Sequence, residues 1–211
     1  MNLSIRHCVI VLTFGLTACA SAPVHYYTLL EPVTTTSPAL PPASFLIDVL
    51  PIGVPAQLDQ PQWVVRQGDS GIAVLDGERW AAPLSDELRA ALSAQLVQRL
   101  GTLDIAGLPQ PINTPVLRIK LQVHRFDAWP GQTVQLDADW SLGYADDVNH
   151  VHLICRGQFN ETAPGGYPEL ARAEQRAVGK LAIQIAEDAS GWTRANQAKC
   201  SSMTSLISSR R

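Results

Sequence analysis

The chain has 211 residues, of which 46% are hydrophobic and 17% charged, and its formal net charge at pH 7 is −3. This length is enough to bury one sizeable hydrophobic core, so we predict a single folded domain. The mild negative charge argues against nucleic acid as a partner and against a purely electrostatic attachment to anionic lipid, since both require a basic surface.

The first 18 residues are typical of a signal peptide for export. Arg6 precedes an apolar run over residues 8–16 that is too short for a bilayer span, which takes roughly 18 or more apolar residues. The run closes on Leu16-Thr17-Ala18-Cys19, which resembles a bacterial lipobox. This resemblance implies cleavage before Cys19 and lipidation of that residue; the alternative is an ordinary signal peptide with a chance cysteine. Ala20, rather than Asp, implies sorting to the outer membrane, facing the periplasm.

Two cysteines remain for the folded domain, because Cys8 leaves with the signal peptide and Cys19 is predicted to carry lipid. In an oxidising compartment, Cys155 and Cys200 could form a disulfide. Cys155 also lies at an inward strand position, where a free thiol behaves as a small hydrophobe. Both alternatives stay open, because the sequence does not give the separation of the two Cα atoms.

We predict four segments in chain order: the signal peptide over residues 1–18, a lipidated tether over 19–24, one domain over 25–192 and a flexible Ser-rich tail over 193–211. The apolar residues of the tail do not recur at a regular spacing, so only a disulfide at Cys200 would order part of it. Within the domain, the prolines of residues 31–43 predict an extended loop.

Short strands are predicted at the start of the domain. Aromatic and branched residues favour a strand over residues 26–30, and the apolar run 44–50 lies between prolines, as a buried strand does. Residues 63–67 and 72–75 favour two more strands. The turn formers at 68–71 predict a hairpin between them.

The spacing of apolar residues predicts two amphipathic helices. One, over residues 83–100 with Gly101 as its cap, is predicted by leucines that recur every four residues: Leu84, Leu88, Leu92, Leu96 and Leu100. The other runs from Pro168 to about Ser190, and its alanine-rich stripe would let it lie close against a sheet.

Between these helices the apolar period changes to two. Residues 117–123, 134–142 and 151–159 alternate apolar with polar side chains, which is typical of strands with one buried and one wet face. We predict an antiparallel meander of these three strands, and helices packed on one or both faces of a mixed sheet.

The sequence shows no catalytic set. It has no phosphate-binding Gly-rich loop and no His-Glu-x-x-His motif, so we predict no enzyme, no metal and no cofactor. Gly68-Asp69-Ser70-Gly71 also surrounds the nucleophile of chymotrypsin-like proteases, in which the base and its acid precede the serine. In the predicted mature chain only His25 lies upstream, so we favour the turn.

Three histidines raise the alternative that the protein binds a metal ion. His150 and His152 lie two apart on a predicted strand and could bind zinc, with His124 on a neighbouring strand. We favour a polar outer face, because no carboxylate or cysteine shares the motif.

Three short motifs follow the lipobox. In chain order they are Tyr26-Tyr27-x-Leu29, Leu58-Asp59-Gln60-Pro61-Gln62, and Trp80-Ala81-Ala82-Pro83-Leu84 at the entry to the first long helix. Their order and spacing resemble the ABC-type transport auxiliary lipoproteins, the PqiC/YmbA-like family. Gln60 stands where arginine is common in that family.

The resemblance implies a three-layer α/β fold with a mixed, about five-stranded sheet and two long helices; a two-layer α+β arrangement is the alternative. It also implies a non-enzymatic component of an MCE-type transport system that moves phospholipid or other hydrophobic molecules between the inner and outer membranes. The partner would be an MCE-domain protein, and a ring of this lipoprotein would suit ring-shaped MCE assemblies. The alternative function is a stand-alone outer-membrane lipoprotein that binds peptidoglycan or an envelope protein.

Five residues of these motifs are candidates for contact with the partner: Leu58, Asp59, Pro61, Gln62 and Trp80. Each also has a structural alternative. Proline and aspartate are common in rigid turns, and a tryptophan at a helix entry can be a packing anchor rather than an interface hot spot.

Overall fold

The structure is a computed structural model that describes residues 22–32, 43–147, 152–195 and 199–201. Cys19, His150, and most of the proline-rich loop and of the tail lie outside these residues. The elements in chain order are β1 (His25–Tyr27), β2 (Leu46–Val49), β3 (Gln62–Gln67), β4 (Gly71–Trp80), α2 (Leu84–Leu100), β5 (Val116–Trp129), β6 (Thr133–Tyr144), β7 (Leu153–Thr162) and α3 (Tyr167–Ala195).

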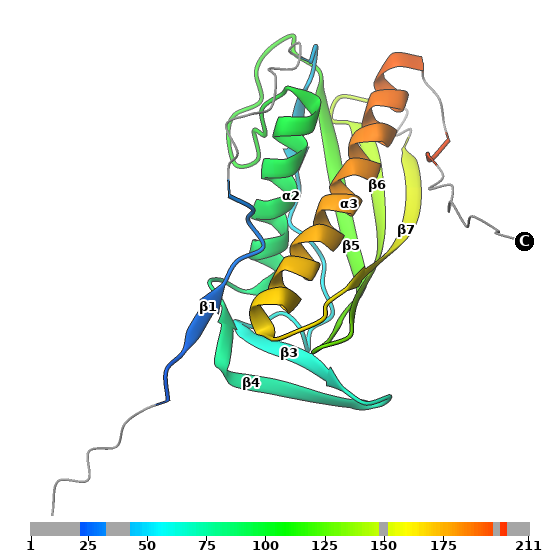
Figure 1. The fold of residues 1–211 in the computed structure, drawn as a ribbon. Helices are drawn as coiled ribbons and strands as arrows, with labels where there is room; N and C mark the ends of the chain where they lie inside the picture. The colour runs from blue at the N-terminus through cyan, green and yellow to red at the C-terminus, as the bar shows by residue number, and fades with distance from the viewer. Residues whose placement is uncertain (1–21, 33–42, 148–151, 196–198, 202–211) are drawn as a thin grey trace, which may run out of the picture.

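The larger sheet has four strands in the order β2-β5-β6-β7. β5, β6 and β7 pair antiparallel, which confirms the predicted meander, and β2 pairs parallel with β5. Side chains that face the helices are buried and their neighbours face outward, because strand side chains alternate. Figure 1 shows α2 and α3 side by side across one face of this sheet.

The smaller sheet has three strands in the order β1-β4-β3. β3 and β4 form the predicted hairpin, and Gly68 in its turn has φ 61°, a conformation that glycine adopts at little cost. β4 continues to Trp80 instead of ending at residue 75, and this extension pairs parallel with β1. The polar run Asp76-Gly77-Glu78-Arg79 hides the extension in the sequence, because it breaks the apolar alternation.

The predicted α/β class is confirmed, and the layers differ in detail from the expectation. Within the described residues, seven strands form two mixed sheets of three and four strands, rather than one sheet of about five. Because both helices cover the same face of the larger sheet, the arrangement matches the two-layer alternative (Figure 1).

Both helices begin close to their predicted starts. α2 ends at Gly101, whose φ of 62° lies in the left-handed region, as predicted. α3 passes through Gly191 and ends at Ala195, because Trp192 still packs into the core. Neither helix in the described part of the chain has the length and apolar character needed to cross a membrane.

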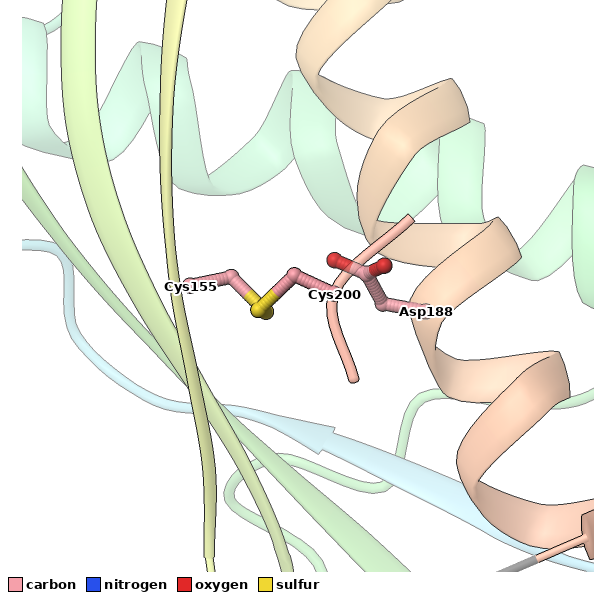
Figure 2. A group of neighbouring side chains, drawn as sticks. All are labelled: Cys155, Asp188 and Cys200. Carbon is pink, nitrogen blue, oxygen red and sulfur yellow. A yellow bond between two sulfur atoms is a disulfide. The ribbon is translucent and has the colours of Figure 1, made fainter. Parts of the chain in front are cut away.

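A disulfide joins Cys155 on β7 to Cys200, with the Cα atoms 5.7 Å apart (Figure 2). The adjoining Ser201 donates its backbone N–H to Asp188 Oδ1 at 2.6 Å, and Trp140 Nε1 donates to Asp188 Oδ2 at 2.9 Å. Residues 199–201 are therefore fixed against β7 by a covalent bond and a buried carboxylate. Cys155, Asp188 and Cys200 could face a metal ion together, but both sulfur atoms are used in the disulfide.

We predict that this disulfide stabilises the domain, because closing a loop of 45 residues in the unfolded chain is worth about 4 kcal/mol. Alkylation of the unreduced, denatured chain followed by intact mass spectrometry should label neither Cys155 nor Cys200. Reduction should lower the melting temperature. Labelling of both residues without reductant would show that the bond is absent.

Candidate partner-binding site

The three family motifs are far apart in the chain but meet at one place, where the small sheet adjoins the first turns of α2 and α3 (Figure 1). Ala81 N donates to Tyr27 O at 2.8 Å, and Trp80 N donates to Pro61 O at 2.7 Å. These two backbone bonds join the first motif to the third and the third to the second. The motifs therefore build one structural unit.

Trp63, immediately after the second motif, is the centre of this unit. Its side chain is 1% exposed, and its ring centroid lies 5.0 Å from that of Tyr27, 4.8 Å from that of Trp80 and 5.9 Å from that of Tyr167. Tilted aromatic pairs at such distances are favourable beyond the area that they bury. We call these four residues the aromatic cluster. It connects β1, β3, β4 and the start of α3.

A buried carboxylic acid lies against the cluster. Trp63 Nε1 donates to Glu174 Oε1 at 3.3 Å, and the other oxygen of Glu174 has no hydrogen-bond partner among the described residues. Burial raises the pKa of Glu174 well above its ordinary value of 4.5, and the indole N–H opposes this only in part. Burial therefore favours the neutral, protonated form of Glu174. Burial and the neighbouring Glu78 carboxylate likewise raise the pKa of Tyr27 to about 12.

The segment after β1 is tied to both helices. Glu87 on α2 accepts hydrogen bonds from Thr28 Oγ1 at 2.7 Å and from Leu29 N at 2.8 Å. Gln175 on α3 donates to Thr28 O at 2.9 Å. Leu29 itself is 1% exposed, which explains the leucine of the Tyr-Tyr-x-Leu motif. The chain that leads from Cys19 thus enters the domain along a rigid path.

The five candidate residues divide into buried and surface positions. Leu58 is 9% exposed and Trp80 is 2% exposed, so both pack inside the domain and fit the structural alternative. Asp59 and Pro61 are exposed and Gln62 is half-buried. Asp59 Oδ1 also accepts a hydrogen bond from Ser85 N at 3.3 Å, which satisfies one of the free N–H groups in the first turn of α2.

The outer face of the larger sheet is polar, as we favoured over zinc binding. Arg156 donates to both oxygens of Asp139, at 2.6 and 2.8 Å, and His124 Nε2 lies 3.0 Å from Asp139 Oδ2. Arg156 first, and His124 second, hold the pKa of Asp139 down at about 2. His124 is thus engaged with a carboxylate. His152 is exposed and His150 lies outside the described residues.

The Gly-Asp-Ser-Gly sequence forms the turn of the β3–β4 hairpin. Ser70 is exposed there, and within the part of the chain that the structure describes no hydrogen bond joins it to a histidine. Its position therefore fits a turn residue.

The comparison with protein families decides what these motifs mean. The model of the ABC-type transport auxiliary lipoprotein component matches residues 27–186. The chain belongs to this family. The match begins at Tyr27 of the aromatic cluster and includes the other two motifs, all of α2 and α3 as far as residue 186. The resemblance drawn from the three motifs is thereby confirmed.

Two solved structures share the fold of this auxiliary lipoprotein. The crystal structure of an uncharacterized protein is 20% identical with a TM-score of 0.62, covering 80% of this chain and 99% of that one. A protein from Xanthomonas campestris, of the family DUF330, is 18% identical with a TM-score of 0.57, covering 81% of this chain and 94% of that one. At these identities the likeness shows the fold alone. No curated protein matches the sequence.

We predict that Glu174→Gln changes how stability depends on pH. A carboxylic acid with a raised folded-state pKa contributes most below its unfolded pKa, near 4.5, and this contribution is lost as pH rises toward the folded value. Glutamine does not ionise, so the melting temperature of the variant, relative to the natural chain, should be higher at pH 8 than at pH 5. Glu169→Gln, an exposed position on the same helix, should show no such trend, and a pH-independent difference for Glu174→Gln would contradict the account.

Proposed function

We propose that this auxiliary lipoprotein is a non-enzymatic component of an MCE-type ABC transport system. It is anchored through Cys19 in the outer membrane, faces the periplasm, and docks with an MCE-domain protein that carries phospholipid or other hydrophobic molecules between the two membranes. The observation that carries the proposal is the family match over residues 27–186, together with the lipobox that ends at Cys19.

The surface part of the second motif is the proposed docking site. Asp59, Pro61 and Gln62 lie at or near the surface, next in the chain to the buried aromatic cluster. A hydrogen bond of 2.7 Å from Trp80 N to Pro61 O holds this segment in place. A rigid support of this kind lowers the entropy that a contact residue loses on binding. These three residues can therefore present a preformed surface to a partner. Copies of the chain arranged as a ring would match a ring-shaped partner.

We predict that Asp59→Asn combined with Gln62→Ala weakens docking without unfolding the domain. Asparagine keeps the oxygen that accepts from Ser85 N, and it caps helices about as well as aspartate, so the melting temperature should not change. Recovery of the MCE-domain protein in a pull-down from detergent-solubilised membranes should fall about tenfold, as expected for contact residues worth 1–2 kcal/mol.

The control is the matched pair Gln67→Ala with Asp69→Asn, which makes the same chemical changes at the exposed other end of β3. This control should leave recovery unchanged. Equal losses from the two double variants would remove the second motif as the docking site. Recovery of cell-wall components alone by the natural chain would contradict the transport function and favour a stand-alone envelope lipoprotein.

A further inference from the structure

The lipid anchor can reach only one end of the domain. Five Cα-to-Cα steps lead from Cys19 to Val24, and a fully extended chain of that length spans about 18 Å. α3 has 29 residues and is therefore about 43 Å long. Figure 1 places β1 beside the N-terminal ends of both helices, with the loop that follows α2 at the opposite end. The β1 end must lie beside the membrane that holds Cys19.

At this end the chain exposes large apolar side chains to solvent. Val24 is 40% exposed, Tyr26 is 65% exposed and Leu30 is 42% exposed. Tyr26 and Tyr27 differ because side chains alternate along β1: Tyr27 enters the aromatic cluster and Tyr26 points outward. An outward tyrosine with flanking aliphatic residues suits the boundary between lipid headgroups and acyl chains, where its ring and its hydroxyl both find a matching environment.

Tyr26 and Leu30 border a shallow hollow against α3. The hollow measures about 700 Å³, and its lining includes Tyr26, Leu30, Pro32, Pro168, Ala171 and Arg172. Gln175 holds one rim in place through its hydrogen bond to Thr28 O at 2.9 Å. The surface is therefore preformed rather than created by contact.

The charges around the hollow balance one another. Arg172 pairs with Glu169, and Arg176 and Lys180 both pair with Glu161, at 2.8 and 2.5 Å. Glu31, on the opposite rim, supplies a further carboxylate, which accepts from Gln95. Because no net positive charge is left, attraction to a bilayer would come from the apolar and aromatic side chains and would not require anionic lipid.

We infer that the face formed by Val24, Tyr26, Leu30 and the first turns of α3 rests on the phospholipid bilayer, with Tyr26 at headgroup depth. This contact fixes the orientation of the domain, so that its long axis leaves the membrane and the loop after α2 points away from it. The inference rests on the proposed lipid anchor at Cys19 and is independent of the MCE partner.

The test places single nitroxide labels on the full-length, lipidated chain in vesicles. Tyr26→Cys reports the proposed face, and Ile112→Cys, at a residue that is 88% exposed in the loop after α2, reports the far end. Vesicles of phosphatidylethanolamine and phosphatidylglycerol are compared with vesicles of phosphatidylcholine alone. The intact mass verifies the lipid on Cys19 beforehand. Because no MCE-domain protein is present, a negative result would contradict the membrane contact without bearing on the docking proposal.

The ratio of oxygen to water-soluble nickel accessibility should be several-fold higher at residue 26 than at residue 112, in both lipid mixtures. A label at Arg172→Cys should show the same contact, and Tyr26→Ser with Leu30→Ser should abolish it while lipid still holds the chain on the vesicle. Equal nickel access at residues 26 and 112 would overturn the inference. Contact at residue 172 that survives the double serine variant would also overturn it, because the anchor alone would then explain the position.

Discussion

The buried indole of Trp63 is the feature on which the rest of the structure depends. It packs against Tyr27, Trp80 and Tyr167 and donates its N–H to Glu174, so one side chain connects the small sheet to the first turns of α3. Apart from this connection, β1 is held by three residues of parallel pairing to β4 and by the hydrogen bonds of Thr28 and Leu29 to the two helices. Strands this short are only marginally stable by themselves.

This constraint links the membrane to the partner. The same cluster that fixes Tyr27 leaves Tyr26 pointing outward, and the same backbone bonds that bury Trp80 hold Pro61 and its neighbours at the surface. A lipid-anchored component must transmit its position from the bilayer to whatever it docks with. Here the path from the anchored segment to the proposed docking residues passes through two backbone hydrogen bonds and the buried indole of Trp63, so the two surfaces keep a fixed relation.

Local patterns were enough to predict most elements but not their partners. The leucine spacing located α2 to within a residue, and the alternation of β5, β6 and β7 predicted their meander. The pairing of β1 with β4 was missed, because its signal lies in a polar stretch and in contacts between residues 53 apart, as for His25 and Glu78. The motifs located the site, yet Trp63 and Glu174 escaped notice, since they are 111 residues apart and only the fold brings them together. Burial of Leu58 and Trp80 likewise follows from tertiary packing.

Amide hydrogen exchange of Trp63→Phe tests most directly whether this residue unites the three motifs. The variant loses the indole N–H that donates to Glu174. The backbone amides of Leu29 in the first motif and of Trp80 and Ala81 in the third should therefore exchange faster together. Amides in the middle of β6 should keep their rates. Faster exchange confined to β3, with Leu29 and Ala81 unchanged, would contradict the account, because the motifs would then be held together by something other than Trp63.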